Sequence, residues 1–119
     1  MDGECSPTDV EGFLDADEDV RVVDIRNPQA FAGGHIPGSE NVPFQQLPDR
    51  VEALTDADRI VTVCPHGKAS VQAAKLIGSY EGTADATVLS MAGGLTAWDG
   101  DLDADAPERE ADEGPEPPF

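Results

Sequence analysis

Hydrophobic positions along the chain follow two spacings, one typical of buried strands and one typical of helices. Short apolar runs rich in β-branched residues occur at 20–24, 60–63 and 87–90, and the run at 60–63 is continuous enough for a strand buried on both faces. Between the runs, apolar residues recur every three or four positions, which predicts amphipathic helices. Strands that alternate with helices predict an α/β fold with a mainly parallel central sheet flanked by helices on both faces.

The helices are marked by their starts and their apolar faces. Ser6 is the predicted N-cap of the first helix, with Pro7 at the first helical position and Asp9 able to reach back. The residues expected to face the core are Val10, Phe13 and Leu14 in this helix, Leu47, Val51 and Leu54 in a middle helical stretch, and Val71, Ala73, Ala74, Ile77 and Tyr80 in a helix after residue 70. Shorter elements are predicted as a helix at 28–31, an extended piece at 40–43, a last short helix at 94–98, and a short edge strand that holds Cys5.

Length and composition divide the chain into one domain and a tail. A chain of 119 residues has room for a single core. From Gly100 onward the sequence turns to Asp, Glu, Ala, Pro and Gly, a composition that buries too little apolar surface to become ordered. We therefore predict a domain over residues 1–100 and an acidic, flexible tail over 101–119.

The net charge limits the partners. Asp and Glu number 25 against 7 Lys and Arg, which gives a formal charge of −18 and argues against nucleic acid or an anionic membrane surface as a partner. Acids spread along a chain with only two lysines favour a halophilic-type protein from a high-salt cytoplasm, where screening makes self-repulsion tolerable.

The sequence also indicates a compartment. No apolar stretch reaches membrane-spanning length, the first residues lack the basic start of a secretory signal, and two cysteines make no disulfide framework. These features predict a cytoplasmic protein with two separate thiols, and the reducing cytoplasm suits a reactive thiol.

Cys64 is the candidate reactive group. It ends the buried strand at 60–63 and begins a short loop that contains Gly67 and leads into a helix. Ligands bind at the carboxyl ends of strands in open α/β sheets, and a loop with a helix N-terminus offers unpaired backbone N–H groups to an anion. His66 and Lys68 place scarce cations beside the thiol, which favours the thiolate. The loop alone equally fits a buried cysteine that acts as a small hydrophobe.

The surrounding segments resolve this choice. Residues 22–31 (VVDIRNPQAF), 34–43 (GHIPGSENVP) and 91–98 (MAGGLTAW) occur in this order around a loop of six residues from Cys64 through Ala69. Together they resemble the single-domain rhodanese (thiosulfate sulfurtransferase) family over about residues 4 to 100. The resemblance implies a rhodanese-like fold.

The same resemblance implies roles for residues outside the loop. Asp24 and Arg26 look like the family's Asp-x-Arg and are expected to form a buried or half-buried ion pair that supports the loop. Where the family commonly has Glu, this chain has Ala30, which removes one partner of Arg26. His35 is similar to a structural histidine bonded to backbone, and Gly93 to Leu95 are expected near the site.

The sulfur transfer that the resemblance implies gives each residue of the loop an expected role. The Cys64 thiolate would attack a small anionic sulfur donor such as thiosulfate, hold a persulfide, and release the sulfur to a thiophilic small molecule or protein acceptor. Backbone N–H groups would cradle the persulfide, Lys68 would bind the sulfonate, and Ser70 would either cap the next helix or bond to Cys64. The residues expected to bind substrate are His66, Gly67, Lys68, Ala69 and Ser70. No cofactor is expected. No metal site is expected either, because the two histidines and two cysteines lack ligand-pair spacing.

Two other functions stay open at this stage. A sulfur-relay subunit would need the same cysteine, and a non-catalytic interaction module could use the same fold. A phosphatase or arsenate reductase on a related Cys-loop fold would need an arginine that closes the loop around a tetrahedral oxyanion, and this chain has Ser70 at that position.

Overall fold

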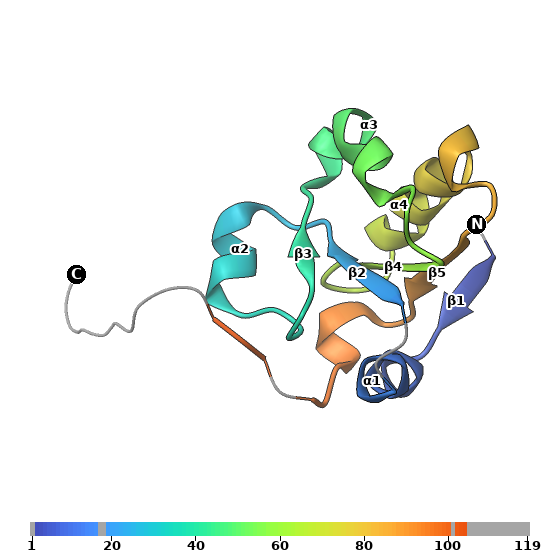
Figure 1. The fold of residues 1–119 in the computed structure, drawn as a ribbon. Coiled ribbons are helices and arrows are strands. Elements are labelled where there is room, and N and C mark those ends of the chain that lie inside the picture. Colours follow the sequence, from blue (N-terminus) through green and yellow to red (C-terminus); the bar gives the residue numbers. More distant parts are fainter. Residues whose placement is uncertain (1, 17–18, 101, 105–119) are drawn as a thin grey trace.

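A computed structural model describes residues 2–16, 19–100 and 102–104 of the chain. Its centre is a parallel sheet of five strands in the order β1-β5-β4-β2-β3 (Figure 1). The strands are β1 (Gly3–Cys5), β2 (Val20–Asp24), β3 (Glu40–Asn41), β4 (Arg59–Val63) and β5 (Thr87–Met91). The predicted α/β fold with a parallel sheet is confirmed, and Cys5 lies in an edge strand as expected.

Helices cover both faces of this sheet. They are α1 (Pro7–Asp15), α2 (Pro28–Gly33), α3 (Leu47–Arg50) and α4 (Ala69–Gly78), with 3₁₀ turns η1 (Phe44–Gln46), η2 (Val51–Leu54), η3 (Glu81–Thr83) and η4 (Gly94–Ala97). Figure 1 shows α3 and α4 on one side of the sheet and α1 with η4 on the other. A short helix was predicted at 94–98. The structure has a 3₁₀ turn there that ends at Ala97, because the backbone of Trp98 is extended.

Local signals in the sequence explain where the first two helices begin. The Ser6 side chain accepts a hydrogen bond from the Asp9 N–H at 3.0 Å, and Asp9 accepts one from the Ser6 N–H at 3.0 Å. This reciprocal capping box satisfies two of the N–H groups that a helix start leaves unpaired. At α2, Asn27 is the N-cap and accepts from the Ala30 N–H at 2.8 Å, a cap that the sequence analysis missed beside Pro28.

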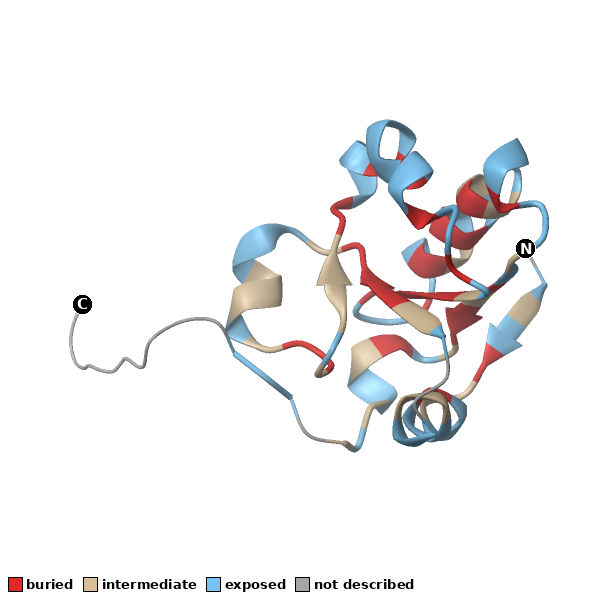
Figure 2. Cartoon of the chain, viewed as in Figure 1, coloured by how far each residue is buried: buried red, intermediate tan, exposed pale blue. Residues whose placement is uncertain are grey.

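The core has two parts, one on each face of the sheet, and the buried residues follow the strands and the inner faces of the helices (Figure 2). Side chains on β4 alternate between them: Ile60 joins the cluster under α3 and α4, whereas Val61 and Val63 join the cluster under α1. Both clusters bury β4, which explains its continuous apolar run. The face predicted from Leu47, Val51 and Leu54 is buried as expected.

The chain remains packed on the domain just after the predicted boundary. His35 and Asp103 form an antiparallel bridge, in which the His35 N–H donates to the Asp103 carbonyl at 2.9 Å and the Asp103 N–H donates back at 2.8 Å. Asp103 is a residue of the predicted tail (101–119), and at this position the chain is paired with the domain. Residues 105–119, the bulk of that predicted tail, lie outside the described residues.

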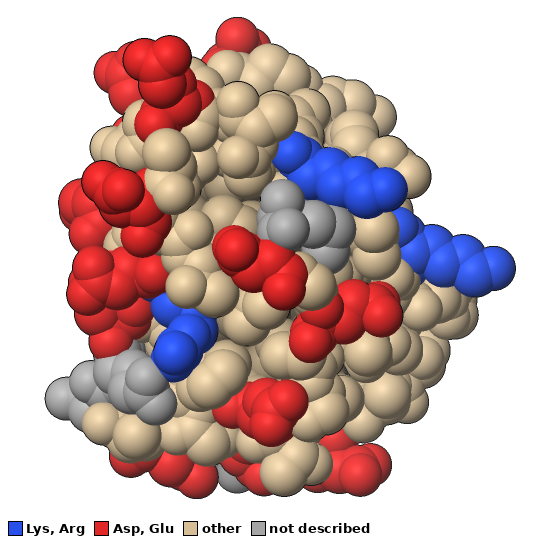
Figure 3. Space-filling view, turned by 90° about the vertical axis from the view of Figure 1, so that its right-hand side faces the viewer, with Lys and Arg blue, Asp and Glu red and all other residues tan. Residues whose placement is uncertain are grey.

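Acidic side chains are spread over much of the face in Figure 3, with a few Lys and Arg side chains among them. One of the few basic side chains, Arg21 on β2, forms partly exposed ion pairs with Glu40 at 2.7 Å and with Asp56 at 2.9 Å. The remaining carboxylates repel one another across the surface. Within the described residues, no helix is long and apolar enough to cross a membrane.

Added salt should therefore stabilise this protein. Raising KCl from about 0.05 M to about 2 M shortens the screening length to a few ångström and weakens repulsion among carboxylates. A gain of about 1 kcal/mol in the free energy of unfolding would raise the Tm by roughly 4–8 °C for a domain of this size. Thermal unfolding followed by circular dichroism across this range checks the expectation. A Tm that does not change with KCl would remove the high-salt explanation for the composition.

Candidate active site

Cys64 lies at the carboxyl end of β4, where the backbone turns sharply into α4. Gly67 makes this turn possible with a left-handed φ of 83°. A Cβ at Gly67 would lie 2.7 Å from the backbone nitrogen of Gly93, so a second reason for glycine is the close approach of the neighbouring turn. The loop is therefore compact, and its inner wall is backbone.

The Cys64 sulfur is buried and surrounded by hydrogen-bond donors. Cys64 as a whole is 2% exposed. The N–H groups of Gly67 and Ser70 donate to Sγ at 3.0 and 3.3 Å, and the Ser70 hydroxyl oxygen lies 3.3 Å from Sγ in a third hydrogen bond. The two N–H donors favour the anionic form of the sulfur, and the Ser70 hydroxyl, which accepts from the thiol, can donate to the sulfur once it is a thiolate.

The charge state of Cys64 is a balance of opposing effects. Burial by itself raises the pKa of the thiol, because it disfavours the charged form. Hydrogen bonds from the Ser70 side chain and from the backbone N–H groups of Ser70, His66 and Gly67 outweigh burial, and the pKa of Cys64 is lowered overall. The thiolate, which is the nucleophile of sulfur chemistry, is thus easier to form at Cys64 than at an ordinary cysteine.

The predicted substrate-binding residues form one continuous loop, but their side chains divide into two groups. His66, Lys68 and Ala69 are exposed on its outer side, whereas Gly67 and Ser70 are buried beside the sulfur. Lys68 is the N-cap residue of α4, without a capping hydrogen bond from its side chain. Ser70 lies inside the helix, so of its two predicted roles the structure shows the hydrogen bond to Cys64 and not the cap.

The turn after β5 braces the loop from the other side. The Leu95 N–H donates to the Cys64 carbonyl at 2.9 Å, and the Thr96 N–H donates to the Pro65 carbonyl at 3.1 Å. Gly94 has a φ of 62°, and a Cβ there would collide with the Cys64 carbonyl and with the N–H groups of the loop. The expectation that Gly93 to Leu95 lie near the site is thus confirmed.

The predicted ion pair is present on the adjacent strand. The Arg26 guanidinium contacts the Asp24 carboxylate at 2.8 Å, and Asp24 is 1% exposed. The same guanidinium nitrogen also donates to the Gly34 carbonyl at 2.6 Å. This chain has Ala30 where a Glu was expected from the family resemblance. The Gly34 carbonyl is a partner of Arg26 in its place. The pair ties β2 to the end of α2, and β2 adjoins β4 through the Ile25 N–H, which donates to the Val63 carbonyl at 3.0 Å.

His35 has the surroundings of a structural residue. Its Nδ1 lies 2.7 Å from the Phe31 carbonyl oxygen, and its ring stacks on the Phe31 ring with centroids 3.8 Å apart. Together with the backbone bridge to Asp103, these contacts join α2 to the segment after β5. The expected bonding of His35 to backbone is confirmed.

Two buried hydroxyl residues beside Cys64 were missed by the sequence analysis. Ser90 on β5 lies 2.7 Å from Ser70, oxygen to oxygen, and Thr62 on β4 donates to the Ser70 carbonyl at 2.7 Å. Thr62 and Ser90 are in register on adjacent strands. A signal was available, because each is a polar residue inside an apolar strand run, and a buried hydroxyl needs a partner.

Cys5 is in a different environment. It lies on edge strand β1, and its pKa is raised to about 11 by burial, with a further contribution from the charge of Asp9. It is therefore a neutral thiol at physiological pH. Across the part of the chain that the structure describes, no group of three or more His, Cys, Asp or Glu side chains could hold a metal ion.

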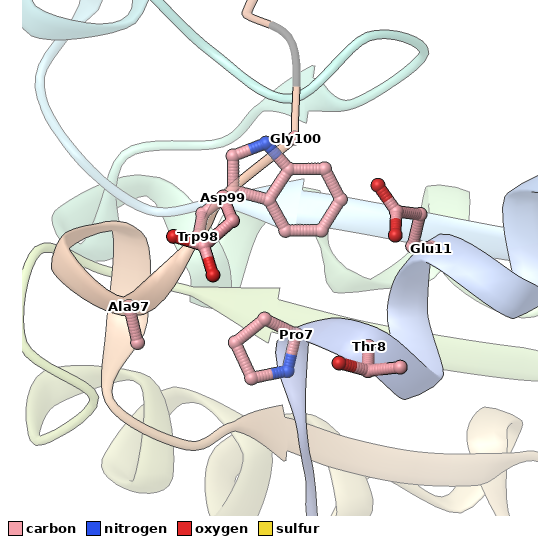
Figure 4. Close-up of a pocket in the computed structure, with 7 residues that line it drawn as sticks. All are labelled: Pro7, Thr8, Glu11, Ala97, Trp98, Asp99 and Gly100. Carbon is pink, nitrogen blue, oxygen red and sulfur yellow. The ribbon is translucent and has the colours of Figure 1, made fainter.

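A separate pocket opens between α1 and the segment after η4 (Figure 4). Figure 4 shows the Trp98 indole between the chain at 97–100 and the Glu11 carboxylate on α1. Its lining residues are Pro7, Thr8, Glu11, Ala97, Trp98, Asp99 and Gly100. None of the predicted site residues is among them, so this pocket is distinct from the Cys64 loop.

Known proteins with similar sequences and folds carry the same domain. A family model described as a rhodanese-like domain matches residues 6–101. Thiosulfate sulfurtransferase GlpE of Pseudomonas aeruginosa (strain LESB58) is 38% identical over 92 residues, which cover 77% of this chain and 81% of that protein. The GlpE of Pseudoalteromonas translucida is 39% identical over 82 residues, which cover 69% of this chain and 75% of that protein.

Solved structures agree on the fold. The rhodanese-like domain protein from Staphylococcus aureus superposes with a TM-score of 0.72 at 22% identity, covering 87% of this chain and 98% of that one. With the family model matching from the first helix to the end of the domain, and relatives this similar over most of their length, the chain belongs to the rhodanese-like domain family.

Proposed function

We propose that this protein is a sulfurtransferase, which takes a sulfane sulfur from a donor such as thiosulfate and holds it as a persulfide on Cys64. The observation that carries the proposal is that two backbone N–H groups donate to the Cys64 sulfur, which is also hydrogen-bonded to the Ser70 hydroxyl. The relatives named thiosulfate sulfurtransferase support it.

The chemistry divides into two displacements. The Cys64 thiolate attacks the outer sulfur of thiosulfate, a sulfur–sulfur bond forms, and the donor's own sulfur–sulfur bond breaks with release of sulfite. A thiophilic acceptor, either a small molecule such as cyanide or a protein thiol, then attacks the outer sulfur of the persulfide and restores the thiolate. Each step moves one sulfur atom, and neither needs an external oxidant.

The loop fits this chemistry better than phosphate transfer. A phosphatase loop of this type clamps a tetrahedral oxyanion with a bidentate guanidinium at its end. In this chain the corresponding position is Ser70, whose hydroxyl is hydrogen-bonded to the Cys64 sulfur. The N–H groups of Gly67 and Ser70 therefore converge on a single sulfur.

Mass spectrometry tests the proposal directly. The protein is incubated with thiosulfate in molar KCl, desalted, digested without reductant, and examined for a gain of one sulfur atom on the peptide that contains Cys64. Addition of cyanide should remove that sulfur and produce thiocyanate. A Cys64 peptide that never gains sulfur from thiosulfate, polysulfide or a persulfide donor would rule the proposal out.

Lys68 should contribute to donor binding. Its ammonium is the cation in the exposed outer part of the loop, and an exposed charge contributes up to about 1 kcal/mol, so Lys68→Ala should raise the KM for thiosulfate about 2- to 5-fold. Lys68→Glu should raise it further, because repulsion adds to the lost attraction. Steady-state kinetics at moderate salt measure the effect.

The matched control for Lys68 is Lys75→Ala, which removes the other lysine from the last turn of α4 and should leave the KM unchanged. Molar KCl should make the KM values of the Lys68 variants more similar, because it screens the charge at this position. Equal KM values for all three Lys68 proteins at moderate salt would make Lys68 a solvated loop charge without a role in binding.

A further inference from the structure

Three buried hydroxyl residues are linked by hydrogen bonds next to the Cys64 loop. Thr62, Ser70 and Ser90 are each 0% exposed, and they come from β4, α4 and β5. The Ser70 and Ser90 hydroxyl oxygens lie 2.7 Å apart, a short hydrogen bond in the interior of the protein. A buried hydroxyl costs free energy unless it is hydrogen-bonded, and each of these three has a partner.

Thr62 and Ser90 hold different parts of Ser70. The Thr62 hydroxyl donates to the Ser70 carbonyl at 2.7 Å and so fixes the first turn of α4, whose N–H group at Ser70 points to the Cys64 sulfur. Ser90 contacts the Ser70 side chain instead. Only the Ser90 contact reaches the hydroxyl that bonds Cys64.

The direction of these hydrogen bonds depends on the charge of Cys64. A hydroxyl has one proton to donate. Opposite a thiolate, which only accepts, the Ser70 proton must point at the sulfur, and the Ser90 proton must then point at the Ser70 oxygen. Opposite a thiol, the S–H can donate to Ser70, and the Ser70 proton can turn to Ser90. The two serines thus form a chain that ends on the anion.

We propose that Ser90 is a positioning residue for Cys64: by donating to the Ser70 oxygen, it orients the Ser70 proton toward the sulfur and favours the thiolate over the thiol. The inference deepens the proposed function, because the thiolate is the attacking form. Hydrogen bonds in such a chain polarise one another, so Ser90 strengthens the Ser70 bond to sulfur without touching the sulfur.

Few charged groups compete with this effect. Residues 87–97, which include β5 and the turn that braces the loop, contain no ionisable side chain, and α4 has only Lys75 in its last turn. His66 and Lys68 are exposed in the loop itself, and on β2 the Asp24 carboxylate is paired with Arg26. The lowering of the Cys64 pKa comes from hydrogen bonds, with Ser70 first among them, which supports the assignment.

The test measures the ionisation of Cys64 and needs no sulfur donor. In a Cys5→Ser background, so that Cys64 is the remaining cysteine, thiolate absorbance in the ultraviolet and the rate of alkylation by iodoacetamide are followed against pH. Ser90→Ala should move the midpoint of both profiles upward by roughly 0.3–0.6 pH units, because it weakens a neighbouring bond. Ser70→Ala should move them by about one unit or more, because it removes a bond to the sulfur.

Two controls separate positioning from packing. Ser79→Ala removes the serine at the other end of α4, whose hydroxyl bonds the Leu76 carbonyl, and should leave the profile in place. Ser90→Thr and Ser90→Val have nearly the same shape and differ in the hydroxyl, so the Thr protein should titrate at lower pH than the Val protein. This pair also serves if Ser90→Ala fails to fold.

The outcomes are distinct. Profiles that coincide for the Thr and Val proteins, or a Ser90→Ala protein with a lower Tm and an unchanged midpoint, would show Ser90 to be a structural link between β5 and α4 and would overturn the inference. Because the profiles are measured without thiosulfate, a failure of sulfur loading in the unmodified protein would count against the proposed function and leave this result standing.

Discussion

Cys64→Ser should abolish sulfur loading and lower sulfur transfer from thiosulfate to cyanide by a factor on the order of 10³ or more, as expected when an enzyme loses its nucleophile. A serine hydroxyl at its ordinary pKa is a far weaker nucleophile than a thiolate. The fold should survive, because the loop is held mainly by backbone groups, including the Leu95 N–H on the residue 64 carbonyl. Production of thiocyanate and the mass of the loop peptide give the result.

Cys5→Ser is the matched control for this experiment. The pKa of Cys5 is raised to about 11, so little of it is thiolate at neutral pH, and its strand pairs with β5 at the edge of the sheet. We expect sulfur transfer at the level of the unmodified protein. Sulfur transfer that persists in Cys64→Ser and disappears in Cys5→Ser would identify Cys5 as the reactive thiol and reject the proposed mechanism.

Gly94→Ala should have the second largest effect, this time on stability. The added Cβ would be placed 2.6 Å from the backbone nitrogens of His66 and Gly67, and it would also contact the Cys64 carbonyl. Those atoms are backbone and have little room to move. Together with the left-handed φ of 62°, the clash should lower the free energy of unfolding by about 3 kcal/mol or more. Urea unfolding curves measure the loss.

Gly12→Ala is a suitable comparison for that variant. Gly12 lies in α1, and a Cβ there would meet nothing within 4 Å. Alanine is the better helix former, so this change should stabilise the protein by roughly 0.5–1 kcal/mol. If Gly94→Ala unfolds at the same urea concentration as the unmodified protein, the turn after β5 is not packed on the Cys64 loop as described.

Local signals explain what the sequence predicted well. The capping box at Ser6 and Asp9 depends on residues three apart, and the face formed by Leu47, Val51 and Leu54 depends on helical spacing, so neither needs knowledge of the rest of the fold. Cys64 was found because a thiol at a strand end before a glycine loop is itself a local pattern. The family resemblance then supplied the ion pair of Asp24 with Arg26.

Contacts between distant segments account for what was missed. Ser90 lies 20 residues from Ser70 in sequence, and the bond between them exists because α4 returns to pack beside β5. The bridge from His35 to Asp103 likewise joins the end of the domain to its first third. Neither spacing nor composition encodes such pairs. For Ser70 the sequence left two local roles open, and neither of them involved β5.

The turn that braces the Cys64 loop has a consequence for synthesis of the chain. A ribosome adds about 5–20 residues per second, so Leu95 follows Cys64 out of the peptidyl-transferase centre after roughly two to six seconds. Until then, the Cys64 carbonyl lacks its Leu95 partner, and β4 lacks β5 and the Ser90 hydroxyl. The surroundings of Cys64 are therefore completed only when residues 90–95 have been added. Chains that stop before residue 90 would carry Cys64 without the Ser90 partner of Ser70 and without the turn that bonds the Cys64 carbonyl.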